Sequence, residues 1–425
     1  MREADETGAD EEPLTGCYFK ELRLQLIAIL RHFIPSFSDL VRRMDGAFPT
    51  NVLAALRSLE HDGAISKECM ERLSETSHPQ SSTYSSVLLR GGGLVPEPAL
   101  PEPHPLDYDW RFAISCFPVF DKILTRVAAD KIATLGAPTL YLHLHKSGRS
   151  PSLYDKNAAL LDSFRMANLE KVVCCDLLEQ QSFNPSADVV IADPPWYLDH
   201  YAGFIAAAQQ LLTEGGFLLL SLLPRLTRPS ASSDRKIVFD LAHAKGFDMV
   251  EGIPGALLYR SPPFEVSSLR AEGVWHGNWR LGDLFVFKKT LRTPEQYAGI
   301  GGSASEQWES FTVGGTSVRV KRSSERNGHL QFETVSATGD IRLHSVSRRS
   351  PTRAGINLWT SRNLAFRITR PDYLSEVLLL NERGVAFFEA IDHVASTNHL
   401  SAPEKEVLRD IILLLVRDAE VNLDD

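Results

Sequence analysis

The sequence predicts an α/β fold with a doubly wound parallel sheet, and three observations support this class. Short apolar runs rich in Val, Leu and Ile alternate with segments of helical periodicity between residues 109 and 290, as in chains that place helices on both faces of a parallel sheet. The run at 189–192 ends in two prolines, which cannot continue a central strand because proline lacks a ladder donor. Gly215 and Gly216 then separate a helical segment from another apolar run at 217–223.

Composition divides the 425 residues into folded parts and joining segments. The first residues are strongly acidic, and the stretch after Thr76 is rich in Ser, Pro and Gly, so neither is expected to form a core. The predicted parts are a disordered tail at 1–16, a winged-helix-like domain at 17–75, a linker at 76–108, the α/β domain at 109–290, a second linker at 291–310 and a C-terminal α+β accessory domain at 311–425.

The net charge, the cysteine spacing and the length of the apolar stretches argue against several classes of protein. A net charge of −9 argues against a uniformly basic nucleic-acid-binding surface, although it leaves room for a local basic patch. The five cysteines lack the paired spacing of a zinc site, so no metal centre is predicted. No apolar stretch approaches the length of a membrane span, and the acidic N-terminus is unlike a signal peptide. We therefore expect a soluble cytoplasmic protein without membrane contact.

Residues 17–75 show three short helical segments followed by a turn and the start of a strand at 64–65, which is the order of a winged helix-turn-helix. One interpretation is DNA binding through cationic and amide side chains on one face. The side chains for this contact are Arg42, Arg43, Asn51 and Arg57. The other interpretation is a docking module for a protein partner or for the rest of the chain, which neighbouring acids favour. These acids are Glu60, Asp62, Glu68 and Glu71.

Periodicity predicts the elements of the α/β domain in order. A helix after Phe120 runs to about Leu135 and is ended by Gly136. The next strands are expected at 139–144, 152–155, 171–175 and 189–192, and the helices at 158–166, 201–212 and 234–245. The last strands are expected at 217–223, 248–251 and 279–288, with a candidate lid loop at 259–264. In an alternative register, residues 111–116 form the first strand.

The chain leaves the sheet at its carboxyl edge directly after the strand at 189–192, and open α/β sheets bind their ligands at this edge. The four residues at this exit are Asp193, Pro194, Pro195 and Trp196. They resemble the catalytic motif of the amino-methyltransferases, which transfer a methyl group from S-adenosylmethionine to an exocyclic amine such as that of adenine. The resemblance implies a Rossmann-like methyltransferase sheet, S-adenosylmethionine as cofactor, and adenine in nucleic acid as substrate.

The resemblance also implies roles for the residues of this motif. The Asp193 carboxylate and the Pro194 carbonyl accept hydrogen bonds from the target amine, and Trp196 stacks on the base, with Tyr197 supporting this aromatic wall. An aryl amine is a poor nucleophile because its lone pair is delocalised into the ring, and two acceptors on its protons favour a pyramidal nitrogen. The rigid turn made with Pro195 holds the acceptors in place at little cost in ordering entropy.

Strand order assigns the cofactor-binding residues implied by the same resemblance. An acid that ends the second strand binds the ribose, and an acid after the third strand reaches the adenine amine, which corresponds to Asp155 and Asp176. The Gly-rich turn of the family is reduced to Gly148 within the segment 143–150. Either this loop is rebuilt around a basic side chain that holds a carboxylate or phosphate, or the pocket is degenerate and the protein is a catalytically silent adaptor.

A second resemblance is to the winged-helix branched-polyamine synthases, which transfer aminopropyl groups from decarboxylated S-adenosylmethionine. It is carried by the helical N-terminal part, the sequence FDKILT at 120–125, the ADPP of the central strand and LTR at 226–228. It implies aminopropyl transfer as the alternative reaction. Arg225 and Arg228 follow the strand after the motif, and either bind substrate phosphate or are solvated loop charges.

The segment 319–370 is basic, with ten arginines and one lysine against three acids. Its strand-like alternation and its arginines predict a β module that binds nucleic acid or another phosphate-rich or acidic partner. Alternatively, the arginines pair with the final segment at 371–425, which carries twelve acids against four bases and is predicted to be helical. The sequence supports both interpretations equally.

Overall fold

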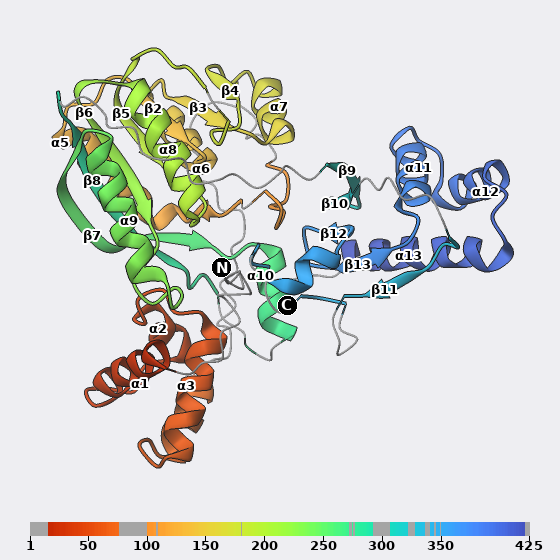
Figure 1. Ribbon diagram of the computed structural model, residues 1–425, viewed down its shortest axis with the longest axis horizontal. Helices are drawn as coiled ribbons and strands as arrows, with labels where there is room; N and C mark the ends of the chain where they lie inside the picture. The colour runs from red at the N-terminus through yellow and green to blue at the C-terminus, as the bar shows by residue number, and fades with distance from the viewer. Residues whose placement is uncertain are drawn as a thin grey trace, which may run out of the picture.

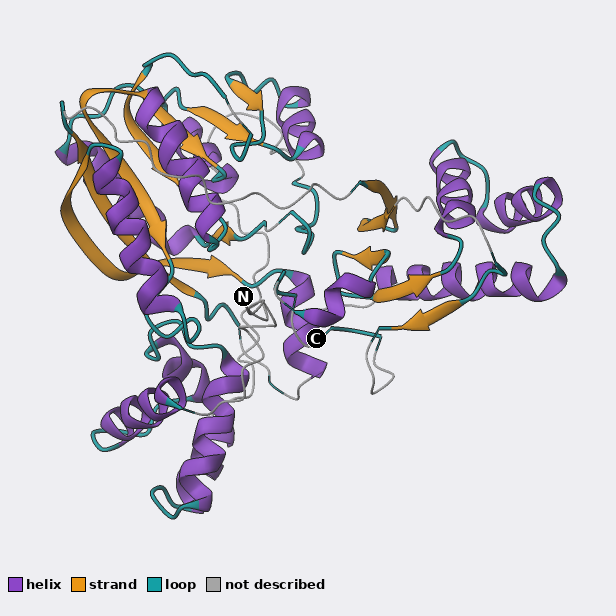
Figure 2. Cartoon of the chain, viewed as in Figure 1, coloured by secondary structure: helices purple, strands orange, loops and turns teal. Residues whose placement is uncertain are grey.

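The computed structural model describes residues 16–75, 100–107, 109–179, 181–271, 274, 277–291, 307–321, 328–335, 341–343, 346–348 and 350–420. Figure 1 shows the N-terminal helices in red and orange, a large sheet with its helices in yellow and green, and a C-terminal part in blue. The N-terminal part is helical, whereas the other two parts combine helices and strands (Figure 2). Of the helices in these ranges, none is long and apolar enough to cross a membrane.

Residues 16–75 fold into the helices α1 (Cys17–Leu30), α2 (Phe37–Arg42), α3 (Pro49–His61) and α4 (Lys67–Glu75). The first three follow the predicted periodicity, but α4 comes where the sequence predicts a continuing strand, and residues 16–75 contain no strand. Ser66 explains the difference, because its Oγ accepts a hydrogen bond from the backbone N–H of Cys69 (3.3 Å) and caps the new helix. The strand expected at 64–65 is therefore wrong, and these residues form no wing.

An eight-stranded sheet of order β1-β7-β8-β6-β5-β2-β3-β4 forms the central part. Its strands are β1 (Arg111–Phe112), β2 (Ile132–Leu135), β3 (Ser152–Asp155), β4 (Val172–Cys174), β5 (Ala187–Ala192), β6 (Leu212–Leu222), β7 (Phe247–Arg260) and β8 (Leu281–Lys289). Strands β2 to β6 pair in parallel, whereas β8, β7 and β1 extend the sheet from β6 in antiparallel fashion. The predicted α/β class is confirmed, with a mixed sheet in place of a purely parallel one.

Helices cover both faces of this sheet, and each face has its own core. The helices are α5 (Phe117–Arg126), α6 (Pro138–Lys146), α7 (Ala158–Met166), α8 (Leu198–Leu211) and α9 (Ala231–Ala244). A further helix, α10 (Pro263–Ala271), contributes Leu269 to the core of the N-terminal part. The core under α8 and α9 includes Leu220 of β6, whereas the core under α5 and α6 includes its neighbour Leu219. Successive side chains of a strand point to opposite faces, so the leucine run of β6 serves both layers.

The first parallel strand lies at a different place from the one predicted. Strand β2 occupies residues 132–135, where the sequence predicts the end of a helix, and the apolar run at 139–144 forms α6 instead of a strand. Pro138 is the first residue of α6, a position where the missing N–H of proline removes no helical hydrogen bond. The run is apolar on nearly all sides because α6 contributes to two cores, and periodicity does not distinguish such a helix from a buried strand.

Strand β7 is longer than predicted and includes part of the candidate lid. It runs from Phe247 to Arg260, so Tyr259 is a buried strand residue, and α10 begins shortly afterwards at Pro263. The lid predicted at 259–264 is therefore wrong. The reason is that β1 and β8 lie along opposite edges of β7 at this point and complete its backbone hydrogen bonds.

The C-terminal part combines a five-stranded antiparallel sheet of order β11-β13-β12-β10-β9 with helices. Its elements are β9 (Trp308–Val313), β10 (Thr316–Lys321), β11 (Phe332–Thr334), β12 (Leu358–Thr360), β13 (Ala365–Ile368), α11 (Pro371–Glu382), α12 (Phe387–Thr397) and α13 (Ala402–Glu420). The three helices bury their apolar faces against this sheet in one core. The predicted β module and the helical final segment thus pack on each other.

Arginines of the basic segment form ion pairs within the protein. Arg342 contacts Asp418 of α13 (2.7 Å), and Arg319 contacts Asp107 of the first linker (2.7 Å). Asp418 is buried and also accepts a hydrogen bond from the Thr360 hydroxyl (2.8 Å). Internal pairing of this kind is what the second interpretation of the segment predicts, although only part of it involves the acids of the final segment.

Asp418 is expected to stabilise the C-terminal part. Its replacement by Ala leaves the Arg342 guanidinium and the Thr360 hydroxyl without this partner, at a cost of about 3 kcal/mol in the free energy of unfolding. Asp418→Ala should therefore unfold at a lower denaturant concentration than the unmodified chain. The matched control is Asp410→Ala, which removes an exposed carboxylate from the same helix. Equal unfolding midpoints for the two variants would contradict the stabilising role of Asp418.

Candidate active site

A cavity of about 410 Å³ opens at the carboxyl ends of the parallel strands. Its inner wall includes Asp155 at the end of β3 and residues 193–197, which directly follow β5. Both terminal parts of the chain also contribute to its lining, with Phe48, Thr50, Asn51, Val346 and Ser347. The three parts of the protein therefore meet at one cavity.

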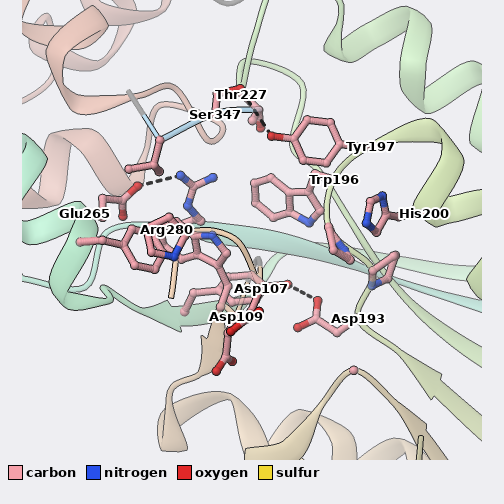
Figure 3. Close-up of a pocket in the computed structure, with 18 of the residues that line it drawn as sticks. Asp107, Asp109, Asp193, Trp196, Tyr197, His200, Thr227, Glu265, Arg280 and Ser347 are labelled. Atoms are coloured by element: carbon pink, nitrogen blue, oxygen red, sulfur yellow. Dashed lines mark hydrogen bonds and ion pairs between the residues drawn. The ribbon is translucent and has the colours of Figure 1, made fainter. Parts of the chain in front are cut away.

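Asp193 is almost fully buried at this edge of the sheet, with 8% of its surface exposed. The Tyr259 hydroxyl donates a hydrogen bond to Asp193 Oδ1 (2.6 Å), and Ser221 Oγ lies 2.6 Å from the same hydroxyl. A dashed line ends at the labelled Asp193 carboxylate in Figure 3. Burial raises the pKa of Asp193 to about 7, although hydrogen bonds from Tyr259 and Ser221 oppose this shift. The carboxyl group therefore changes its ionisation near neutral pH, which is a property common among functional carboxylates.

Trp196 and Arg280 form an aromatic and cationic wall beside Asp193. Trp196 packs edge-on against Tyr259, with ring centroids 5.8 Å apart. The Arg280 guanidinium lies 5.3 Å from the centroid of Trp196 and 3.9 Å from that of Trp110, and it pairs with buried Glu265 (2.8 Å). Figure 3 shows Arg280 between Glu265 and Trp196. The indole rings of this wall thus already contact a cation.

Asp155 and Asp176 follow the second and third parallel strands, as strand order predicts, and both line the cavity. Asp155 Oδ1 accepts the backbone N–H of Asn157 (2.8 Å), and Asp176 Oδ1 accepts that of Leu178 (2.9 Å). Burial, with a smaller contribution from the nearby charge of Asp109, raises the pKa of Asp155 to about 6, although the hydrogen bond from the Asn157 backbone opposes this shift. The hydrogen bonds from backbone N–H groups hold each carboxylate in a defined orientation.

Gly148 is not among the residues that line the cavity. It follows α6, and no atom lies within 4 Å of the position that a Cβ would take. The cofactor-binding role predicted for Gly148 does not fit this position, because the first parallel strand is β2. The turn after β2 contains Gly136, which has a φ of +63° and lines the cavity. A Cβ on Gly136 would lie 3.2 Å from the Asp193 carbonyl oxygen, so glycine permits this close approach of two backbone segments.

The two arginines predicted to bind substrate differ in their positions. Arg228 lines the cavity, but it is buried, pairs with Asp234 (2.8 Å) and donates a hydrogen bond to the Trp196 carbonyl (2.6 Å). It therefore holds the backbone of the motif. Arg225 is not among the cavity-lining residues and pairs with Asp45 of the N-terminal part (2.8 Å). The predicted substrate contact of Arg225 is replaced by a contact between two parts of the chain.

The N-terminal part packs closely on the central part. Its apolar core includes Leu226, Leu269 and Trp279, which belong to the central part. Gly46 lies against Pro224, where an added Cβ would approach the proline ring to within 2.8 Å. Because apolar side chains of both parts are buried in one core, the N-terminal helices are held beside the cavity.

Two of the four side chains considered for DNA contact face the rest of the protein. Asn51 lines the cavity, and Arg42 Nε donates a hydrogen bond to the Asn278 carbonyl (3.0 Å). Arg43 and Arg57 are exposed, as is much of the Arg42 side chain. The interpretation of these helices as a docking module accounts for the first two side chains.

More acids than bases line the cavity. The acids are Asp107, Asp109, Asp155, Asp176, Asp193 and Glu265, and the bases are Lys156, Arg228 and Arg280. Two of the bases are paired with carboxylates. Three of the acids are also paired with arginines, namely Glu265 with Arg280, Asp107 with Arg319 and Asp109 with Arg111. The preference for a ligand with positive charge or hydroxyl groups therefore depends on the strand-end acids Asp155, Asp176 and Asp193. Among the described residues, no group of three His, Cys, Asp or Glu side chains could hold a metal ion.

Sequence reasoning missed three residues of this site, namely Gly136, Tyr259 and Arg280. The Gly136-Ala137-Pro138 tripeptide is a strong turn signal, and its recognition would have placed the first strand before it. Tyr259 and Asp193 are 66 residues apart in the sequence. No local pattern connects them, and only the pairing of β7 with the rest of the sheet brings them together.

No protein-family model matches the chain, and no curated protein matches it. Among solved structures, the branched-chain polyamine synthase from Thermus thermophilus, in complex with N4-aminopropylspermidine and 5′-methylthioadenosine, is similar at 14% identity. This similarity covers 69% of our chain and 93% of that chain, with a TM-score of 0.48. A C9 mutein of the same enzyme has 13% identity, coverage of 67% and 90%, and a TM-score of 0.49.

A glycopeptide N-methyltransferase, MtfA, is similar at 14% identity over 42% of our chain and 92% of that chain, with a TM-score of 0.29. The similar structures therefore include both groups that the sequence resembles, the S-adenosylmethionine-dependent methyltransferases and the branched-chain polyamine synthases. All of these TM-scores are below 0.5, so we infer function from the residues of the site.

Proposed function

We propose that the protein is an S-adenosylmethionine-dependent transferase that methylates an amine nitrogen. The observation that carries this proposal is the convergence of Asp155, Asp176 and Asp193 on one cavity at the carboxyl ends of neighbouring strands. A carboxylate accepts hydrogen bonds from two vicinal hydroxyls at once, which suits Asp155 to a ribose. Asp176 is the corresponding acceptor for an adenine amine.

The residues of the cavity fit this cofactor. Asp155 is a half-buried carboxylate at the mouth of a parallel strand, and the turn at Gly136 leaves little room for a side chain between the ends of two strands. When bound, S-adenosylmethionine supplies an electrophilic methyl carbon on a sulfonium. Asp155, Asp176 and the Gly136 turn would hold it, leaving Asp193 and the residues beyond it for the acceptor.

Asp193 and the carbonyl of Pro194 would act on the acceptor amine. Asp193 and Pro194 both line the cavity, and a rigid Pro-Pro turn follows the carboxylate. Hydrogen bonds from the amine to two fixed acceptors localise the nitrogen lone pair toward the electrophile. Once the nitrogen is alkylated it is cationic, and it releases a proton to the Asp193 carboxylate or to water. An exocyclic amine of a planar base, stacked on Trp196, is the acceptor that this arrangement suits by shape.

Aminopropyl transfer is a second candidate, and the charge of the cavity favours it. Acids outnumber bases in the lining, and the strand-end acids Asp155, Asp176 and Asp193 are among them. An aliphatic polyamine is cationic and would gain from these carboxylates. The donor in that case would be decarboxylated S-adenosylmethionine.

Incubation with each of the two donors, followed by mass measurement of the products, tests both candidates. The acceptors would be spermidine and an adenine-containing single-stranded oligodeoxynucleotide. A mass gain of one methyl group with S-adenosylmethionine supports the first candidate, and a gain of one aminopropyl group with the decarboxylated donor supports the second. No product, together with no calorimetric binding of either donor, would leave the chain as a catalytically silent adaptor.

The pH dependence of transfer is expected to report on Asp193. The carboxylate must be ionised to accept an amine N–H, and its pKa is about 7, so the rate should rise as the pH increases through about 7. Tyr259→Phe removes a hydrogen bond that lowers this pKa, and it should move the acidic limb of the pH–rate profile to higher pH. If the acidic limb of the pH–rate profile of Tyr259→Phe lies at the same pH as that of the unmodified chain, a group other than Asp193 controls the rate.

A further inference from the structure

Residues 346–348 of the C-terminal part reach the cavity beside the motif. Val346 and Ser347 line it, and they are the described residues of the C-terminal part that do so. The hydroxyl of Tyr197 lies 3.4 Å from Ser347 Oγ and accepts a hydrogen bond from the backbone N–H of Arg348 (3.3 Å). Figure 3 shows Tyr197 and Ser347 pointing toward each other, with Trp196 alongside.

Arg348 makes the strongest contact of this segment. Its two terminal nitrogens donate to the two carboxylate oxygens of Asp199 over 2.8 Å each, which is the bidentate geometry of the strongest ion pairs. The same guanidinium lies 4.0 Å from the centroid of the Tyr197 ring. One side chain of the C-terminal part therefore holds both an aromatic residue of the cavity wall and a residue of the first turn of α8.

Asp199 depends on this contact because it is buried. Burial raises its pKa, but hydrogen bonds from His200 and Arg348 outweigh burial and hold the pKa well below its usual range. Removal of the arginine would leave a buried carboxylate with one fewer partner, and the first turn of α8 would rearrange to solvate it. Tyr197 is the residue before this helix, so such a rearrangement would move the wall next to Trp196.

The contact lies on the acceptor side of the cavity. The residues that fit the cofactor are Asp155, Asp176 and Gly136, which follow β3, β4 and β2. The contact of Arg348 is instead with Tyr197 and Asp199, which follow the motif after β5. Displacement of this wall would therefore affect the acceptor before it affects the cofactor.

We infer that Arg348 is a positioning residue of the acceptor site, through which the C-terminal part sets the affinity for the acceptor but not for the cofactor. This inference rests on the proposed transfer to an amine. It gives the C-terminal part a role in catalysis that is independent of any nucleic-acid contact by its other arginines.

Steady-state kinetics of full-length variants test the inference, with spermidine or the adenine-containing oligodeoxynucleotide as acceptor. Arg348→Ala should raise the acceptor KM about 10-fold or more, because a misplaced contact wall weakens binding. Calorimetric affinity for S-adenosylmethionine should stay within about twofold of the unmodified value. Arg348→Lys, which keeps the charge but loses the bidentate pair, should lie between Arg348→Ala and the unmodified chain.

The matched control is Arg367→Ala, which removes an exposed arginine from β13 of the same part. An Arg348→Ala variant with the acceptor KM of this control would overturn the inference. So would an equal loss of acceptor and cofactor affinity, which would indicate only a general role in folding. In an Asp199→Asn background the further effect of Arg348→Ala should be much smaller, because the two side chains act as a pair.

Hydrogen exchange separates failure of this inference from failure of the proposed function. Amides of residues 197–203 should exchange about 10-fold faster in Arg348→Ala than in Arg367→Ala, while those around Gly136 stay unchanged. If the unmodified chain transfers nothing to either acceptor, the proposed function fails. Faster exchange confined to residues 197–203 would then show only that Arg348 orders the first turn of α8, whereas unchanged exchange there would overturn the inference even in an active enzyme.

Discussion

Asp193→Ala is expected to lower the rate of transfer about 100- to 1000-fold, which is the usual loss when one fixed hydrogen-bonding group is removed from a site that stabilises developing charge. Asp193 is buried, is held by the Tyr259 hydroxyl and faces the cavity, so no solvent-exposed side chain can replace it. Affinity for S-adenosylmethionine should change little, because Asp155 and Asp176 remain. The measurement is the turnover of labelled donor under saturating conditions.

Two further variants test whether the loss of rate in Asp193→Ala comes from the missing carboxylate. Asp193→Asn keeps the shape and one acceptor oxygen but loses the charge, so its rate should lie between those of the unmodified chain and Asp193→Ala. The control is Asp188→Ala, at the opposite end of β5, where the carboxylate only accepts the backbone N–H of Lys131 (3.0 Å). A rate in Asp193→Ala equal to that in Asp188→Ala would refute the assignment of Asp193 to the acceptor amine.

Asp155→Ala is expected to weaken S-adenosylmethionine binding about 100-fold. The carboxylate would accept hydrogen bonds from two ribose hydroxyls, and the loss of such charge-assisted bonds costs about 3 kcal/mol, or about 100-fold in affinity. Asp155 ends β3 and lines the cavity, and its carboxylate is held in one orientation by the backbone N–H of Asn157. Calorimetric titration with S-adenosylmethionine measures the effect without any need for an acceptor.

Asp155 also accepts the backbone N–H of Asn157 (2.8 Å), so a second variant separates binding from loop geometry. Asp155→Asn keeps an oxygen for this N–H, and it should still lose most of the cofactor affinity because the charge is gone. Asp162→Ala, which removes an exposed acid from α7, serves as the control. Full affinity in Asp155→Asn would show that the carboxylate does not bind the cofactor.

Local chemistry made part of this site predictable from sequence. Two prolines end a strand wherever they occur, so the exit after β5 and the position of Asp193 at the sheet edge follow from residues 189–195 alone. Asp155 and Asp176 were assigned by the resemblance to the methyltransferases, which implies an acid at the end of the second strand and another after the third. The same residues line one cavity in the structure.

The first strand shows where such reasoning ends. The apolar residues at 132–135 and 139–144 are similar in hydrophobicity, and a short buried helix and a short buried strand have no distinguishing period. The tertiary structure decides between them, because residues 132–135 pair with β3 and β5, whereas α6 fills the space between two cores. Because residues 132–135 are the first parallel strand, the turn that follows this strand contains Gly136 and not Gly148.

The exit of the chain from the sheet at residues 193–195, and with it the position of Asp193 at the sheet edge, was therefore determined by the sequence, because it depends on neighbours in the chain. Only the tertiary structure decided the environment of Asp193, since the Tyr259 hydroxyl arrives on an antiparallel strand 66 residues away. It also decided that the two terminal parts contribute to the cavity, through side chains such as Phe48 and Ser347. Contacts between residues so distant in sequence depend on how whole elements pack, and no local pattern records that packing.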